Sequence, residues 1–165
     1  MKRIIFVRHG QAEAGSAGIT DFERSLTHKG KEVSRLMALK LREKVKDPGV
    51  LITSPAFRAY ETAVIFGEVN GISADKIILQ SQLYLNVNAK SLMDMIKLAG
   101  EDIVSVTFFG HNPTFTDLAN YFCNEPLDSV PKSGIVSLTF DSKTWSDIRP
   151  DTGNAELFLK PRKTL

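Results

Sequence analysis

Short apolar runs alternate with longer amphipathic segments along most of the chain. The runs have the length of β-strands and comprise Ile4–Val7, Val50–Thr53, Ile77–Leu79 and Ile103–Phe109. The segments between them place apolar residues three or four positions apart, as helices that cover a sheet do. Ile103–Phe109 is mainly apolar and carries no charge, which favours a central strand with both faces covered. Ile77–Leu79 is short and indicates an edge strand.

Capping residues and helix breakers predict where the helices begin and end. Candidate N-caps are Thr27, Ser54, Asn88 and Asn112, with proline at the first helical position after Ser54 and Asn112. Candidate stops are 47–49 (Asp-Pro-Gly), 70–71 (Asn-Gly) and Gly100. The first helix is predicted to bury one face that consists of Val33, Leu36, Met37, Leu41 and Val45.

The pattern changes to a period of two after Pro131. Val136, Leu138 and Phe140 alternate with small polar residues, and Leu157 and Leu159 have the charged neighbours Glu156 and Lys160. Both stretches predict late antiparallel strands. No repeat, low-complexity tract or linker divides the chain, so we expect residues 1–165 to form one domain.

Composition is that of an ordinary globular protein, with 42% apolar and 24% charged residues. The 21 basic and 19 acidic residues leave a net charge of only +2, which excludes a basic nucleic-acid footprint. No apolar run approaches the ~20 residues that span a bilayer, and only four apolar residues precede Arg8, too few for a signal peptide. We therefore expect a cytoplasmic protein without a membrane partner. The single cysteine, Cys123, is interpreted as a small buried hydrophobe rather than a nucleophile.

Polar side chains that can carry chemistry follow two of the predicted strands directly. Arg8-His9-Gly10 follows the first strand, and Gly110-His111-Asn112 follows Ile103–Phe109. The carboxyl ends of parallel strands in open α/β sheets are where ligands bind, because helices cover both faces. The sequence therefore predicts a site at this edge that contains two of the three histidines.

A third group belongs to the helix that begins near Ser54. Arg58 falls in its first turn, where unpaired amides and the helix dipole favour an anion, and a guanidinium adds a bidentate donor. The alternative is a surface arginine paired with Glu61 or Glu68. The loop Gln11–Ser25 is longer than most strand-to-helix connections, and such loops commonly cover a site.

These motifs, in this order, resemble the histidine phosphatase superfamily, which has the phosphoglycerate mutase-like fold. The motifs are Arg8-His9-Gly10, Ser54-Pro55 with Arg58-Ala59 and Thr62-Ala63, and Gly110-His111-Asn112. The short length and the segment from Asp21 to Gly30 resemble the small SixA-type phosphohistidine phosphatase branch. The resemblance runs from the first strand to Phe140. It implies a three-layer α/β/α fold whose sheet is mainly parallel with an antiparallel edge strand.

The same resemblance implies roles for individual residues. His9 is expected to be the nucleophile that accepts the phosphoryl group, and Arg8, Arg58 and His111 are expected to hold its oxygens. Arg24 is expected near the pocket. A phosphoryl group in transfer spreads charge over three oxygens, so several fixed donors and one in-line nucleophile suffice. The scheme requires no cofactor and no metal, and the sequence offers no metal-ligand spacing.

The chain departs from the family pattern in its general acid. Members that hydrolyse phosphate esters carry a carboxylate after the third strand, whereas the segment Gln80–Asn86 has neither Asp nor Glu. Asp21 and Glu23 on the long loop are the possible proton donors. The alternative is that they are solvated charges or partners of Arg24.

Three functions are compatible with these observations. The first is a phosphatase for phosphohistidine in a protein, for example a histidine-phosphorylated signalling protein. The second is a phosphatase or mutase for a small phosphate ester, and the third is a catalytically inactive module that binds phosphate or a phosphopeptide. The missing acid and the absence of insertions that would build a deep sugar-phosphate pocket favour the first, and the presence of every catalytic position disfavours the third.

Overall fold

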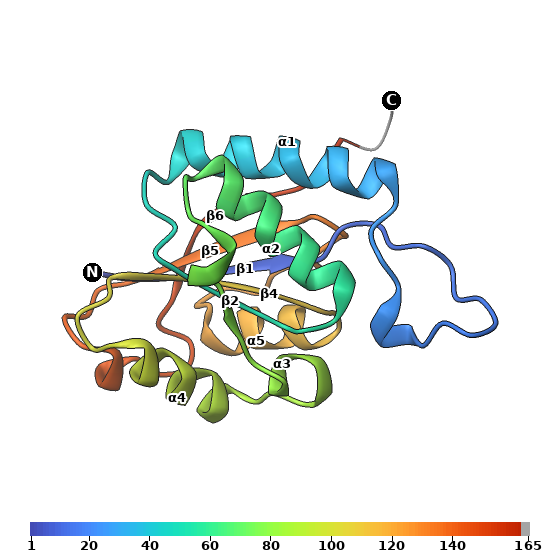
Figure 1. Ribbon diagram of the computed structural model, residues 1–165. Coiled ribbons are helices and arrows are strands. Elements are labelled where there is room, and N and C mark those ends of the chain that lie inside the picture. The colour runs from blue at the N-terminus through green and yellow to red at the C-terminus, as the bar shows by residue number, and fades with distance from the viewer. Residues whose placement is uncertain (163–165) are drawn as a thin grey trace.

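A six-stranded sheet forms the centre of the computed structural model, which describes residues 1–162 (Figure 1). The strands are β1 (Lys2–Arg8), β2 (Val50–Thr53), β3 (Ile78–Leu79), β4 (Ser105–Gly110), β5 (Ile135–Phe140) and β6 (Asn154–Leu159). Their spatial order is β3-β2-β4-β1-β5-β6. The first four in this order run parallel, while β5 is antiparallel to both β1 and β6. The predicted, mainly parallel α/β sheet is confirmed.

The position of the antiparallel strand differs from the expectation. β5 does not form an edge but lies between β1 and β6, and β6 at the edge runs in the direction of β1. The connection from β5 to β6 contains only the 3₁₀-helix η3 (Trp145–Asp147) and no helix that crosses the sheet. Strands joined without such a crossover pair antiparallel, so β6 adds to the free side of β5.

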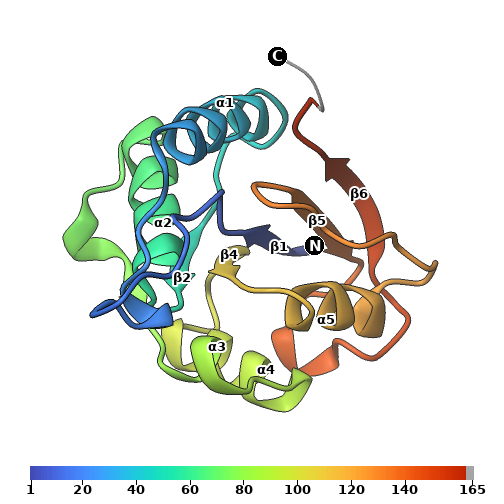
Figure 2. The same cartoon turned by 90° about the vertical axis from the view of Figure 1, so that its right-hand side faces the viewer.

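Helices cover both faces of the sheet and complete three layers (Figure 2). One face carries α1 (His28–Lys44) and α2 (Phe57–Val69). The other carries α3 (Gln82–Leu85), α4 (Ala89–Ala99) and α5 (Thr114–Phe122). Two further 3₁₀-helices are η1 (Asp21–Glu23) and η2 (Ala74–Lys76). None of the helices in residues 1–162 is long and apolar enough to cross a membrane.

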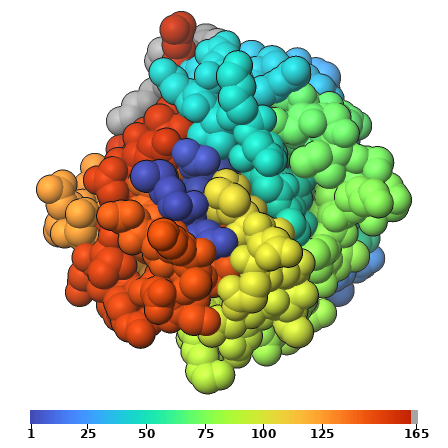
Figure 3. Space-filling view, turned by 90° about the vertical axis from the view of Figure 1, so that its left-hand side faces the viewer, coloured from blue at the N-terminus to red at the C-terminus, as the bar shows by residue number. Residues whose placement is uncertain are grey.

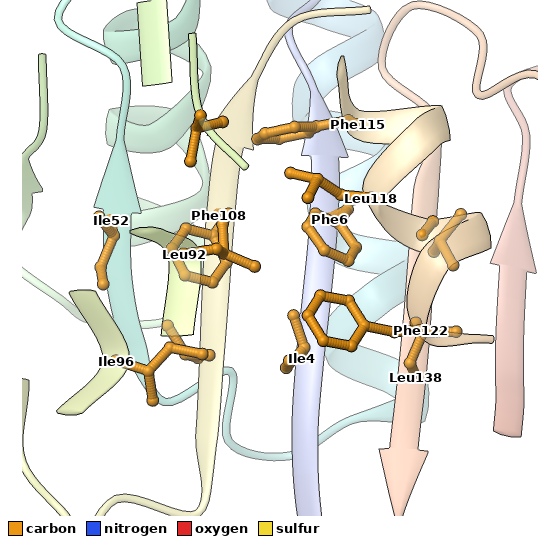
Figure 4. Packing of buried hydrophobic residues seen from close by; sticks show 14 of the residues in the cluster. Ile4, Phe6, Ile52, Leu92, Ile96, Phe108, Phe115, Leu118, Phe122 and Leu138 are labelled. Carbon is orange, nitrogen blue, oxygen red and sulfur yellow. The ribbon is translucent and has the colours of Figure 1, made fainter. Parts of the chain in front are cut away.

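The apolar run of β1 is explained by the two cores on either side of it. Ile4 and Phe6 pack with α4 and α5 (Figure 4). Ile5 and Val7 pack with α1 and α2 on the other face, and all four side chains are fully buried. Successive side chains of a strand point to opposite faces, so a strand covered on both sides needs apolar residues throughout. This burial holds the carboxyl end of β1 in a fixed place.

The buried face of α1 differs from the predicted one. Leu36 is 55% exposed, and Ser34 is fully buried instead. The turn of the helix around Gly30 lies so close to the backbone of Gln11 that a Cβ atom at Gly30 would stand 2.2 Å from the Gln11 carbonyl oxygen. This contact turns Gly30 and Ser34 inward and leaves Leu36 facing solvent.

Two helices and one strand begin later than predicted. α2 starts at Phe57 and α5 at Thr114, so the prolines precede both helices. Ser54 still belongs to the sheet edge, because its amide donates to the carbonyl of Phe109 at 3.0 Å. β4 starts at Ser105, because Lys2 Nζ donates to the carbonyl oxygen of Ile103, 2.8 Å away, outside the strand ladder.

At the end of the molecule opposite the loop Gln11–Ser25, the N-terminal residues pack against other segments of the chain. Figure 3 shows this end, where the N-terminal residues lie between the segment near residue 100 in yellow and the C-terminal segments in orange and red. Lys2 is buried there and donates to the carbonyls of Glu101 and Ile103. The carboxyl ends of the parallel strands therefore lie at the other end, beside the loop Gln11–Ser25.

Candidate active site

The ends of β1 and β4 place two histidines side by side. Arg8 pairs in register with Gly110, and the amide of His9 donates to the Gly110 carbonyl at 3.0 Å. The next residue on each strand, His9 and His111, therefore meets the other, with 5.2 Å between ring centroids. The backbone pairing alone fixes this juxtaposition.

The imidazole of His9 is buried and held in one tautomer. Its Nδ1 lies 2.7 Å from the carbonyl oxygen of Gly10, an acceptor, so Nδ1 carries the proton and Nε2 keeps a lone pair. The Nε of Arg58 donates towards this Nε2 at 3.4 Å. Burial lowers the pKa of His9 to about 3, and the neighbouring His111, Arg58 and Arg8 act in the same direction, while the Gly10 carbonyl opposes them. His9 is thus neutral at physiological pH.

Arg58 joins the strand ends to the long loop. It lies in the first turn of α2, is only 6% exposed, and donates through its two terminal nitrogens to the backbone carbonyl of Asp21 at 2.8 Å and to Asp21 Oδ2 at 3.0 Å. The alternative pairing with Glu61 or Glu68 is not formed. Glu61 accepts from the amide of Leu26, and Glu68 pairs with Arg35.

Two nitrogens in this region are buried without a hydrogen-bond partner within residues 1–162, namely Arg8 Nε and His111 Nδ1. Other nitrogens of the same two side chains do have partners. Arg8 Nη1 donates to the carbonyl of Val130 at 3.0 Å, and His111 Nε2 lies 2.8 Å from Ser54 Oγ. Burial and the charge of Arg58 lower the pKa of His111 to about 4. Unpaired buried polar atoms are uncommon and call for an explanation.

The loop side of the site is organised by the Asp21 carboxylate. Oδ1 accepts from Arg24 Nε and Nη2 at 3.1 and 2.9 Å, and Oδ2 accepts from the Tyr84 hydroxyl at 2.9 Å as well as from Arg58. Although burial acts to raise it, these hydrogen bonds lower the pKa of Asp21 to about 2. In this arrangement Asp21 is a carboxylate and has no proton to donate at neutral pH. Glu23 bonds only to Thr20 and does not line the pocket.

A pocket of about 400 Å³ lies between the strand ends and the loop. It is lined by Arg8, His9, Ala12, Asp21, Arg24, Arg58, Tyr84, His111, Asn112 and Lys132. The structure therefore brings together all the predicted site residues except Glu23.

Comparison with known proteins agrees with this geometry. Residues 4–82 match the family model of the histidine phosphatase superfamily, branch 1. The amino-terminal half of the chain is therefore similar to this superfamily. No curated protein sequence matches it.

Several solved structures share the whole fold. A protein histidine phosphatase SixA complexed with tungstate is 25% identical, with 96% of this chain and 97% of that chain covered and a TM-score of 0.79. A structure described as a phosphohistidine phosphatase SixA from Agrobacterium tumefaciens is 23% identical, covers 97% and 98%, and has a TM-score of 0.78. A mycobacterial glucosyl-3-phosphoglycerate phosphatase in complex with VO₃ is 18% identical, covers 94% and 100%, and has a TM-score of 0.65. These likenesses extend the predicted three-layer fold to nearly the full length of the chain.

The pocket contains residues that the sequence did not indicate. Tyr84 comes from the segment where only an acid was sought, and Lys132 precedes β5. β5 begins where β1 ends, since Ile135 pairs with Val7. Residues just before an antiparallel strand therefore reach the same sheet edge as residues just after a parallel one, and this signal would have identified Lys132.

Two further questions from the sequence concern the single cysteine and a metal site. Cys123 is buried and lies outside the residues that line the pocket, as the interpretation as a small hydrophobe requires. Within residues 1–162 no three His, Cys, Asp or Glu side chains are grouped so that they could hold a metal ion. The site as a whole presents a neutral imidazole nitrogen beside fixed cationic donors, an arrangement that can bind an anion and attack it.

Proposed function

We propose that this chain is a phosphatase that removes the phosphoryl group from phosphohistidine in a protein, through a covalent phosphohistidine on His9. The partner is then a histidine-phosphorylated protein, residues 1–165 act as one domain, and the reaction proceeds in the cytoplasm without metal or cofactor. Hydrolysis of a small phosphate ester is the competing activity that the experiments below separate from it.

The observation that carries this proposal is the state of His9. An imidazole is a nucleophile only through an unprotonated nitrogen. The Gly10 carbonyl fixes the proton on Nδ1, and a pKa of about 3 keeps Nε2 unprotonated at neutral pH. Most surface histidines lack both features. Here they coincide in a side chain that faces Arg58 across 3.4 Å and lines the pocket.

The residues around His9 supply the donors that a phosphoryl group requires. Arg8, Arg58 and His111 form an oxyanion cage, as we call these three residues. Arg8 Nε and His111 Nδ1 have no partner among the described residues, and both side chains line the pocket. The positive charge of the two arginines compensates the negative charge that spreads over these oxygens during transfer.

The proposed reaction has two steps. His9 Nε2 forms a bond to phosphorus while the P–N bond of the substrate breaks, and the departing imidazole takes its proton from solvent. Water then attacks phosphorus, the bond to Nε2 breaks, the proton of the water passes to solvent, and inorganic phosphate leaves. His9 regains its lone pair, so the cycle closes without any redox change.

The lack of a proton donor supports phosphohistidine as the substrate. Among residues 1–162, Asp21 is the only one with a carboxylate that lines the pocket, and it is ionised. The Tyr84 hydroxyl, whose pKa is raised by burial and by Asp21, is a weaker acid still. An alkoxide leaving group needs a proton as it departs, whereas the second ring nitrogen of phosphohistidine can be protonated by solvent beforehand.

Labelling of the protein tests this function directly. The full chain is mixed briefly with a ³²P-labelled phosphohistidine peptide in excess chelator and quenched in base. We expect a label on the protein that is lost in acid and stable in base, because phosphohistidine has this stability. His9→Ala should carry no label and should lose turnover.

His28 provides a matched control for the His9→Ala substitution. His28 is 89% exposed and bonds only to Glu32 four residues on, so His28→Ala should label and turn over like the unaltered chain. Labelling of His9→Ala at the original level would refute the nucleophile. A label that is absent in excess chelator and appears when a divalent ion is added in excess over the chelator would refute the metal-free scheme.

A further inference from the structure

The carboxylate of Asp21 is bound as a substrate anion would be. Arg24 and Arg58, together with the Tyr84 hydroxyl, direct four donor atoms to its two oxygens. Two guanidinium groups and a hydroxyl are the donor types that bind phosphate or carboxylate ligands in proteins. The pocket thus contains a complete anion subsite next to the oxyanion cage, and the protein's own side chain occupies it.

The loop that carries Asp21 is fixed to the rest of the structure. Thr20 and Glu23 cap the short helix η1 around Asp21, and Arg24 Nη1 donates to the carbonyl of Glu13 at 2.9 Å. Further along, the amide of Leu26 donates to Glu61 Oε1 at 2.8 Å. These contacts keep the Asp21 carboxylate at the pocket mouth, where its side chain is 54% exposed to approaching ligands.

Pocket size alone does not restrict the ligand to one phosphoryl group. A volume of about 400 Å³ falls within the range of pockets for small organic ligands. The restriction has to be electrostatic, because a second anionic group would meet the Asp21 carboxylate instead of the arginines behind it. Like charges at such short range disfavour binding.

We propose that Asp21 is a specificity-determining residue of the phosphatase reaction. Its carboxylate fills a subsite that consists of Arg24, Arg58 and Tyr84. The pocket therefore accepts a substrate with one phosphoryl group and a neutral leaving group, and rejects substrates with a second phosphate or a carboxylate beside the first. This inference rests on the proposed function and narrows its substrate class.

Binding of two non-hydrolysable anions tests the subsite. Methylphosphonate offers one anionic group, and methylenediphosphonate offers two. Their dissociation constants are measured by calorimetry at pH 7.5 for the full chain and for Asp21→Ala. We expect the preference for the diphosphonate over the monophosphonate to rise about tenfold in the variant, since a hydrogen bond to a charged group is worth about that factor. An unchanged preference would overturn the proposal.

Two further variants separate the subsite from a general change in charge. Glu13→Gln removes one negative charge from the same loop, at an exposed side chain outside the pocket lining, and should leave the preference unchanged. The double variant Asp21→Ala with Arg24→Ala should not show the raised preference for the diphosphonate, because Arg24 is then no longer present to bind the second anionic group. A gain in Glu13→Gln, or one that persists without Arg24, would contradict the assignment.

The outcome is distinguishable from failure of the proposed function. If Asp21→Ala proves unstable by circular dichroism, Asp21→Asn, which keeps the side-chain size, takes its place with the same expected rise. A chain that labels on His9 but shows no change in anion preference refutes only the role of Asp21. A chain that neither labels nor binds methylphosphonate refutes both.

Discussion

The two halves of the pocket are held in place in different ways. The strand-end half comprises Arg8, His9 and His111, and the loop half comprises Asp21, Arg24 and Tyr84. Residues of the strand-end half lie at the ends of the paired strands β1 and β4. Main-chain carbonyls orient His9 and Arg8, through Gly10 and Val130 respectively, and the Ser54 hydroxyl contacts His111. Residues of the loop half hold one another by side-chain contacts of partly exposed groups.

This difference separates two kinds of function. Backbone pairing and burial are insensitive to salt and to single surface substitutions, so they suit a nucleophile that needs accurate placement. Partly exposed ion pairs contribute little to stability and are easily altered. They suit the selection of substrates. Arg58 belongs to both halves, because its Nε faces His9 while its terminal nitrogens bond to Asp21.

The assignment of catalysis to the strand-end half and of substrate selection to the loop half would be wrong if the loop half supplied a proton during catalysis. We expect kcat/KM for a phosphohistidine peptide to exceed that for a phosphoserine peptide by roughly 10² to 10⁴, the usual contribution of a positioned acid. An aryl phosphate should fall between them. Steady-state kinetics on the three substrates, with Asp21→Asn and Glu23→Gln run in parallel, provide the measurement.

Two results would contradict this expectation. Equal rates on phosphoserine and phosphohistidine would show that an acid operates. A selective loss of ester hydrolysis in either loop variant would place that acid on the loop, despite the pKa of about 2 for Asp21 in the free pocket.

Substitution of the arginines sharpens the comparison. Arg58→Ala should lower kcat by roughly 10² to 10³, the cost of one transition-state donor. Arg24→Ala should change KM by no more than about fivefold and leave kcat nearly constant, since a partly exposed ion pair is worth ~0.2–1 kcal/mol. Arg35→Ala, which removes only an exposed pair with Glu68, is the control and should have no effect. Similar losses of kcat in Arg24→Ala and Arg58→Ala would contradict the different roles of the two halves in catalysis and in substrate selection.

The last prediction concerns stability as a function of pH, which tests the strand-end half without any substrate. His9 and His111 have pKa values of about 3 and about 4 in the fold, against 6.5 ordinarily. Between pH 6.5 and 4 the unfolded chain therefore binds protons that the folded chain does not, and the free energy of unfolding should fall as the pH falls. The slope is at most about 1.4 kcal/mol per pH unit for each histidine.

Urea unfolding at several pH values provides this measurement. His9→Gln should flatten the slope between pH 6.5 and 4, because one buried imidazole is gone. His28→Gln, at the exposed start of α1, should leave the slope unaltered. A slope that is equal in His9→Gln and in the unaltered chain would contradict the buried neutral state of His9.

Several features of the fold could be predicted from the sequence because they depend on local patterns. The apolar runs before His9 and His111 identify buried strands, and the rule for strand carboxyl ends brings the two histidines together. Arg58 is located by the start of its helix. The departures come from tertiary contacts. The close approach of Gly30 to the backbone of Gln11 sets the buried face of α1, and apolar periodicity does not predict such a contact.

What the sequence by itself determined is the strand-end half, together with the α/β architecture that carries it. Here each residue lies at the end of a strand that the apolar pattern identifies, and one backbone pairing brings the two strand ends together. Only the tertiary structure decided the loop half: that Asp21 binds Arg58, 37 residues away, and Tyr84, 63 residues away, and that Lys132 reaches the pocket. The physical reason is that these contacts join distant segments through a few polar atoms, and no hydrophobic period along the chain encodes which distant polar atoms will meet.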